Sequence, residues 1–101
     1  MITITAVIRA KTGRLEGLKA ALLAVADYVD RNEPDTIGFF ISQDIDDPSV
    51  FTTYERFSSS EAKNAHNGSS AVAAFFAQAD ALIEQPVVLH TCAEISARRK
   101  I

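Results

Sequence analysis

A carboxylate and an imidazole are spaced so that they could do acid–base chemistry together. Glu55 lies within Val50–Phe57, a stretch whose alternating side chains are typical of a strand, and His66 follows on a segment with a helical pattern. A single strand-to-helix turn separates the two, so both can face the space between a sheet and a helix. An ionisable pair between otherwise apolar layers is where this sequence predicts chemistry.

The strand and helix that must position this pair have recognisable signals. One face of the strand carries Phe51, Thr53, Glu55 and Phe57. Ser58, followed three residues later by Glu61, predicts a capping box in which each side chain bonds a backbone N–H at the start of the helix. That helix then presents His66 on the same face as Ala62 and Ala65.

His66 is the expected catalytic base, with Glu55 as its catalytic partner. An imidazole with an ordinary pKa of about 6.5 can take a phenolic proton at neutral pH. A structural interpretation is also open, in which His66 only hydrogen-bonds Glu55 and fixes the helix to the strand. Both interpretations hold if Glu55 orients the ring. Glu55 alone could instead face solvent from an edge strand.

Aromatic side chains supply candidate walls for a substrate pocket. The predicted substrate-binding residues are Phe39, Phe51, Phe57, Phe75, Phe76 and Arg9. Any one of the phenylalanines could instead pack in the core, but as a set they fit an apolar cavity with few polar groups. Arg9 could orient an anionic substrate, or it could end its strand in a pair with a surface acid. Tyr54, on the strand face opposite Glu55, is assigned to a dimer interface.

The first half of the chain shows a strand, a helix and a hairpin. Ile2–Ala10 alternates as a strand, and Thr12-Gly13 ends it. Apolar residues then recur every three or four positions, which predicts a helix of roughly 18 residues; they are Leu15, Leu18, Leu22, Val25 and Val29. Thr36–Ile45 is a second strand, and Asp46–Ser49 is a turn that joins it to the third as an antiparallel hairpin.

The second half ends in a helix and a strand. Asn67-Gly68 predicts a helix stop, after which Ser69 or Ser70 can cap a further helical segment. Pro86 is expected to end that segment, and Val87–Ser96 to form the last strand. The element order β-α-β-β-α-β predicts an α+β, ferredoxin-like fold, a four-stranded antiparallel sheet with the helices on one face. The other face is left open, and we expect a homodimer whose sheets pack face to face.

Composition bounds the class of protein. The chain has 101 residues, which fits one domain over residues 1–101, and 48% of them are hydrophobic. A net charge of −3 argues against nucleic-acid binding, and the basic Arg98, Arg99 and Lys100 predict a solvated tail. Cys92 is the only cysteine, which predicts no Cys-based metal site and a reducing, cytoplasmic location. No signal peptide or membrane span is expected.

Several short pieces, taken in order, resemble the antibiotic biosynthesis monooxygenase domain of the dimeric α+β barrel superfamily. They are Asn32-Glu33-Pro34, Gly38, Asp44 to Pro48, Phe51 to Phe57, Ser60-Glu61-Ala62 and Ala65-His66. The resemblance spans nearly the whole chain. It implies oxidation of a small electron-rich aromatic, such as a quinol, phenol or anthrone, by molecular oxygen without a cofactor, in a pocket between sheet and helices.

Other activities on the same scaffold stay open. Related haem degraders use an Asn from the first strand and a Trp, whereas this first strand has no Asn and the chain has no Trp, so haem degradation is less expected. A small-molecule isomerase would use the same base without oxygen. A dimer that binds aromatic ligands without turnover is the non-enzymatic alternative.

Overall fold

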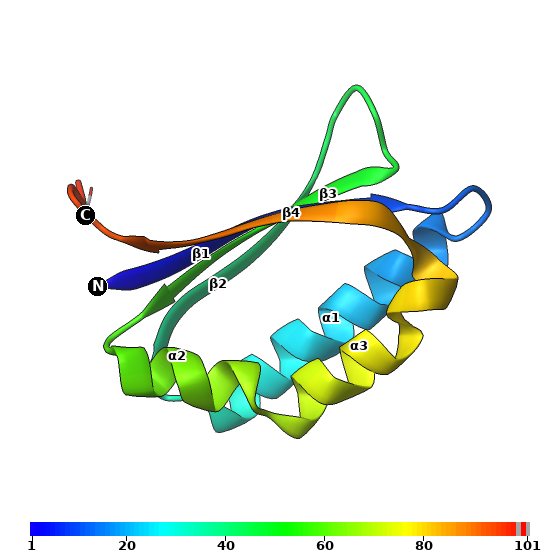
Figure 1. The fold of residues 1–101 in the computed structure, drawn as a ribbon. Coiled ribbons are helices and arrows are strands. Elements are labelled where there is room, and N and C mark those ends of the chain that lie inside the picture. The colour runs from blue at the N-terminus through cyan, green and yellow to red at the C-terminus, as the bar shows by residue number, and fades with distance from the viewer. Residues whose placement is uncertain (99, 101) are drawn as a thin grey trace.

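The computed structural model describes residues 1–98 and 100, and it shows helices packed on one face of a four-stranded sheet (Figure 1). The elements are β1 (Ile2–Ala10), α1 (Leu15–Asn32), β2 (Thr36–Gln43), β3 (Val50–Phe57), α2 (Ser60–Asn67), α3 (Ser70–Leu82) and β4 (Ile83–Ala93). The predicted ferredoxin-like fold is confirmed, with two helices between β3 and β4. Arg99 of the predicted basic tail lies outside the described residues.

The sheet has the order β2-β3-β1-β4, and all neighbouring strands are antiparallel. β1 and β3 pair in unbroken register, from Ile2 opposite Phe57 to Arg9 opposite Val50. Side chains alternate between the two faces of a strand, so this register sets which residues meet the helices. On the helix side are Ile4, Ala6 and Ile8 of β1 and Phe51, Thr53, Glu55 and Phe57 of β3, all buried.

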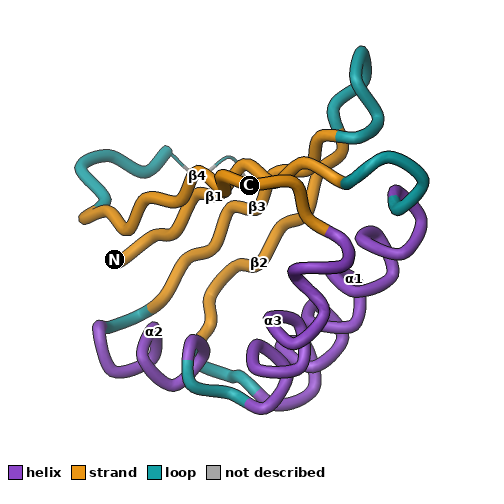
Figure 2. The backbone as a smooth tube through the Cα atoms, turned by 45° about the vertical axis from the view of Figure 1, so that its right-hand side comes forward, coloured by secondary structure: helices purple, strands orange, loops and turns teal. Residues whose placement is uncertain are grey.

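α1 spans 18 residues, as its periodicity predicts. Its buried stripe faces the sheet and consists of Leu18, Ala21, Leu22, Val25 and Val29. α3 lies beside α1 (Figures 1 and 2), and Gly17 permits this approach, because a Cβ there would stand 2.9 Å from Leu82 Cδ2. Among the described residues, no helix is both long enough and apolar enough to cross a membrane.

The start of α2 differs from the prediction by one residue. Ser59, not Ser58, is the N-cap, and its side-chain oxygen accepts the backbone N–H of Ala62 at 3.1 Å. Ala62 is therefore the N3 residue, so Glu61 cannot complete a capping box with Ser58. The one-residue shift still leaves His66 on the buried side of α2, where it is the one buried residue of that helix.

The boundary between α3 and β4 lies earlier than predicted. Ser69 caps α3 as expected, but the helix ends at Leu82, and Ile83 already has extended backbone angles and starts β4. Pro86, predicted to end the helix, lies inside the strand. It is tolerated there because β4 is an edge strand, and because the pairing register with β1 shifts between Val7 and Arg9.

The face of the sheet away from the helices carries exposed apolar side chains. They include Val7, Phe40, Tyr54 and Val88, which come from all four strands. The ring of Phe40 stacks on that of Tyr54 with centroids 6.2 Å apart. Figure 2 shows α1, α2 and α3 on the opposite side, so no helix or strand of the described residues covers this face.

Candidate active site

His66 stands between two carboxylates in the layer between sheet and helices. Its side chain is 4% exposed, and each ring nitrogen meets a different glutamate. Nδ1 lies 2.8 Å from Oε1 of Glu33, the residue that follows α1, and Nε2 lies 3.3 Å from Oε1 of Glu55 on β3. Glu55 therefore faces inward beside the imidazole and not toward solvent.

Hydroxyl groups and aromatic rings fix the two carboxylates and the imidazole. Thr53 donates its hydroxyl to Glu55 Oε2 at 2.9 Å, and Thr36 donates to Glu33 Oε1 at 2.8 Å. Glu33 Oε2 is buried and has no hydrogen-bond partner among the described residues. The rings of Phe39 and Phe57 lie against the imidazole, with centroids 5.5 and 5.3 Å away. The imidazole is thus held by polar contacts at its edge and apolar contacts at its faces.

The two carboxylates determine the charge of His66. Burial lowers the pKa of the imidazole, but the hydrogen bonds to Glu55 and Glu33 and their negative charges outweigh that cost, so the pKa is raised above its ordinary value. An imidazolium donates from both nitrogens and keeps no lone pair. The sequence prediction assigned proton abstraction to His66 and orientation to Glu55, and the structure places these two side chains in contact.

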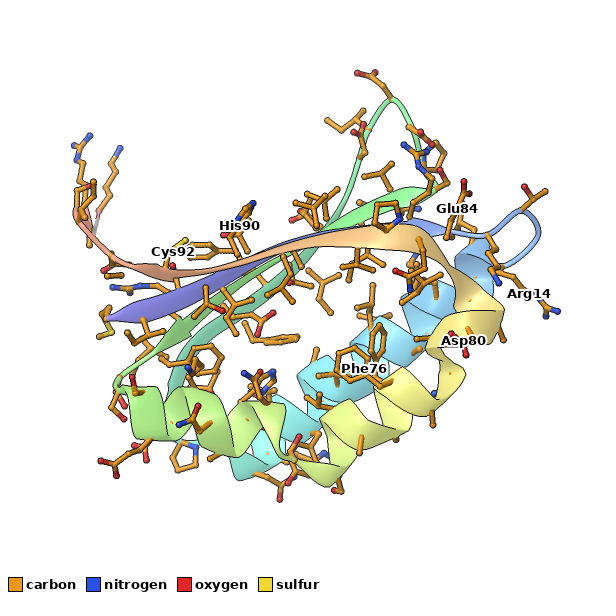
Figure 3. The ribbon with its side chains drawn as sticks, viewed as in Figure 1. Arg14, Phe76, Asp80, Glu84, His90 and Cys92 are labelled. Atoms are coloured by element: carbon orange, nitrogen blue, oxygen red, sulfur yellow. The ribbon has the colours of Figure 1, made fainter. Side chains whose placement is uncertain are left out.

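A cavity of about 320 Å³ lies between the sheet and the helices, and the Glu55–His66 pair forms part of its wall. The apolar lining comes from every layer of the fold and includes Ile4, Ile8, Leu22, Phe39, Val72, Phe75, Phe76, Val87 and Leu89. Asn67, Thr53 and Gln85 add the other polar groups. Figure 3 shows Phe76 on α3 pointing toward the sheet. An apolar chamber with a few convergent polar groups is typical of a small-molecule site.

A second, smaller hollow of about 210 Å³ lies on the other side of His66. It is lined by Tyr28, Asn32, Glu33, Pro34, Asp35, Thr36, Ala62, Ala65 and His66. His66 is the one residue that lines both hollows, since Glu55 lines only the larger and Glu33 only the smaller. The imidazole therefore forms the partition between the apolar cavity and an outer recess.

Comparison with known protein families finds a match over most of the chain. The sequence pattern of the family described as antibiotic biosynthesis monooxygenase matches residues 1–78. The chain belongs to this family. No curated protein sequence matches the chain.

Solved structures share the antibiotic biosynthesis monooxygenase fold seen here. PA3566 from Pseudomonas aeruginosa is 24% identical with a TM-score of 0.83, and 94% of each chain is covered. Rv0793 from Mycobacterium tuberculosis is 21% identical with a TM-score of 0.88, covering 97% of this chain and 98% of that one. SO0527 from Shewanella oneidensis is 27% identical with a TM-score of 0.79, covering 90% and 89%. These likenesses establish the fold and leave function to the site.

The predicted substrate-binding phenylalanines of this family member divide into two groups. Phe39, Phe75 and Phe76 line the cavity. Phe51 and Phe57 do not: they are 1% and 0% exposed and are fully packed in the interior. Both lie on the helix-facing side of β3, where Phe51 packs in a cluster of buried residues from β1, α1 and the α3–β4 boundary. Their contribution is to packing, and Phe57 in addition supports the His66 ring.

Arg9 lies outside the cavity, at the far end of β1. Its side chain points from the open face of the sheet toward the hairpin between β2 and β3, where Nη1 pairs with Asp47 Oδ2 at 2.8 Å. Hydrogen bonds from Ser49 and Arg9 lower the pKa of Asp47 to about 2. Arg9 therefore pairs with an acid on the surface, which is one of the two roles that the sequence allowed. At this end of β1 it lies too far from the Glu55–His66 pair to orient a substrate.

His90 and Cys92 lie on β4, on the side of the sheet away from the helices (Figure 3). Both are exposed, and no group of three or more His, Cys, Asp or Glu side chains in residues 1–98 and 100 has the arrangement of a metal site. Glu33 and Glu55 approach opposite ring atoms of His66 and do not converge on one point. His66 therefore hydrogen-bonds Glu33 through Nδ1 and contacts Glu55 through Nε2 at ion-pair distance.

Sequence reasoning missed Glu33 as a site residue. Asn32-Glu33-Pro34 contributed to the family resemblance, yet by pattern alone it is a helix end, and a glutamate there is normally solvated. Pro34 gave a partial signal, because a proline restricts the backbone direction where the chain leaves α1. The sequence did not show that Glu33, at the end of α1, would lie against His66 of α2, 33 residues later in the chain.

The raised pKa of His66 predicts how stability changes with pH. A group whose pKa is higher in the folded chain contributes stability that is complete below its unfolded pKa, about 6.5, and is lost as pH rises through the folded pKa. We therefore expect the free energy of unfolding to fall above about pH 6.5, by at most about 1.4 kcal/mol per pH unit for one proton. Urea denaturation across this range measures it. The same slope should persist in His90→Gln, and a stability that rises over this range would contradict the prediction.

Proposed function

We propose that this protein is a cofactor-independent monooxygenase that oxidises a small electron-rich aromatic of the quinol, phenol or anthrone type. The observation that carries the proposal is the buried Glu55–His66 pair in the wall of an otherwise apolar cavity of about 320 Å³. Membership of the antibiotic biosynthesis monooxygenase family supports it. The volume suits one aromatic ring system, because ligand pockets begin at about 300 Å³.

The proposed chemistry begins with a proton transfer inside the cavity. A phenolic O–H donates its proton to Glu55, whose carboxylate is kept in place by the hydroxyl of Thr53 and by Nε2 of His66. The phenolate that forms is a far better electron donor than the neutral phenol. It passes one electron to molecular oxygen, and recombination of the aromatic radical with superoxide forms a C–O bond in a peroxide. The peroxide takes back the proton held by Glu55. Its O–O bond then breaks as water leaves with the hydrogen of the oxidised carbon, and the carbon keeps one oxygen as a carbonyl. The largely apolar walls leave few polar groups to compete with these contacts.

Oxygen consumption with a panel of quinols, phenols and anthrones tests the proposal. Wild type should consume oxygen with at least one of them, and His66→Gln should reduce kcat/KM because Glu55 loses its charged donor. Glu16→Gln removes a charge at an exposed position of α1 outside the cavity and should be silent. Absence of substrate-dependent oxygen uptake across the panel would refute the proposal. Turnover that persists without oxygen would point to an isomerase, and saturable binding without product to a ligand-binding dimer.

We further propose that the protein acts as a homodimer through the open face of the sheet. Val7, Phe40, Tyr54 and Val88 expose apolar surface there, with Phe40 59% exposed. A second copy of the same face would cover these side chains, and two-fold dimers are the commonest assemblies. Proteins of this family are typically dimeric. The exposed thiol of Cys92 fits a reducing, cytoplasmic location.

A further inference from the structure

Glu33 belongs to the candidate site although it does not touch the cavity. Its side chain is 11% exposed, and it lies behind His66, where it lines only the outer recess. One of its oxygens, Oε1, accepts from the hydroxyl of Thr36 and lies 2.8 Å from Nδ1 of His66. The other, Oε2, is buried without a partner in the described residues. A buried, half-satisfied carboxylate is costly to a small domain, which suggests that its contact with His66 serves the site.

The contact geometry restricts where protons sit on the imidazole. An ionised carboxylate can only accept hydrogen bonds, and each ring nitrogen of His66 faces one. A neutral ring has a lone pair on one nitrogen, which would face a carboxylate oxygen and repel it. If Nε2 carried that lone pair, Glu55 would have to bind a proton, and its ability to take one from a substrate would be lost. The site therefore depends on a protonated Nδ1 and a protonated Nε2 together.

We propose that Glu33 is a positioning residue of this site, which holds both ring nitrogens of His66 protonated so that Nε2–H is donated to Glu55 and Glu55 stays ionised toward the cavity. This inference rests on the proposed function for the role of Glu55. Glu33 touches no substrate; it acts through His66. Because the imidazole separates the two hollows, the charge of Glu33 in the outer recess can influence Glu55, the proposed base, in the inner cavity.

The other ionisable groups near His66 do not supply this control. Tyr28 of α1 and Asp35 of the loop before β2 line the outer recess, and β2 contributes only Phe39 against the ring. On α2 itself, Glu61 is exposed and Lys63 half-buried. Within the part of the chain that the structure describes, the hydrogen bonds and charges that raise the pKa of His66 come from Glu55 and Glu33. Glu33 is therefore the group whose removal should change the proton affinity of the ring.

An NMR titration of His66 tests the inference without any substrate. In wild type, ¹⁵N shifts should show both ring nitrogens protonated at neutral pH. Glu33→Gln keeps an acceptor oxygen but removes the charge, so it should lower the pKa of His66. Glu33→Asp keeps the charge and should restore most of the shift. A neutral His66 in wild type at pH 7, or a Glu33→Gln titration that coincides with wild type, would overturn the inference.

The pH profile of kcat/KM then connects Glu33 to the reaction. The alkaline limb of this profile reports loss of the imidazolium proton of His66. In Glu33→Gln, the pKa of that limb should therefore fall by the same amount as the His66 pKa measured by NMR. A merely structural Glu33 would change the rate or the stability and leave the limb in place. If no aromatic is oxidised, the proposed function fails, while the NMR result still decides the role of Glu33 in setting the charge of His66.

Discussion

Replacing Glu55 with glutamine should lower kcat/KM for a hydroxylated aromatic by about 10²–10⁴-fold, the usual contribution of a positioned base. Glutamine has nearly the same shape, and its carbonyl oxygen can still accept from Thr53 or from Nε2 of His66. The fold and the cavity should therefore survive. The amide cannot take a proton, so the loss should fall on kcat. Initial rates of oxygen uptake, with the fold checked by circular dichroism, measure it.

A matched control for this variant lies on the surface of α1. Glu16→Gln makes the same chemical change at an exposed position in the first turn and should leave the rate unchanged. Raising the pH until the free phenol is ionised should partly rescue Glu55→Gln, because no base is then needed. A Glu55→Gln variant with the wild-type rate, beside an inactive His66→Gln, would return the role of base to His66.

Truncating Phe51 to alanine should lower the free energy of unfolding by about 3–5 kcal/mol, the usual cost of removing a buried phenylalanine. Its side chain is 1% exposed and belongs to the core cluster that joins β1, α1 and the α3–β4 boundary. Domains of this kind have about 5–15 kcal/mol in total, so the variant could lose most of its stability. Urea denaturation gives the value directly.

Phe76→Ala serves as the comparison for Phe51→Ala. Phe76 is 64% exposed in the single chain and lines the cavity, so its truncation should cost far less stability and act on KM. Phe51→Leu should recover much of the lost stability and leave KM unchanged. A small stability loss in Phe51→Ala together with a raised KM would restore Phe51 to the substrate-binding set that the sequence predicted.

The elements of the fold could be predicted because they depend on local patterns. The same patterns put Glu55 and His66 within reach of each other but left open whether they touch. Strand alternation fixes that Glu55 shares a face with Phe51 and Phe57, and the 3.6-residue period places His66 on the buried side of α2. These two side chains are 11 residues apart, joined by a short connection. Short connections leave few ways for a helix to pack on its own strand.

Features that depend on distant parts of the chain could not be predicted in the same way. Nothing local to Glu33 shows that it will face α2, because the approach is set by how α1 crosses the sheet. The division of the phenylalanines has a similar cause: Phe39, Phe75 and Phe76 border a space that the helices leave unfilled. Whether a buried aromatic meets a neighbour or a void is a property of the assembled layers.

The chain Glu33–His66–Glu55 also has a consequence for selectivity. With His66 protonated as we propose, one imidazolium faces two carboxylates, which leaves one surplus negative charge beside the cavity. None of the described lining residues is a lysine or arginine. When an uncharged phenol gives its proton to Glu55, the negative charge only moves from protein to ligand. An aromatic acid would bring an additional anion into a low-dielectric space and be repelled. The cavity should therefore select ligands by charge as well as by shape. It should bind uncharged phenols and reject aromatic rings that carry a carboxylate.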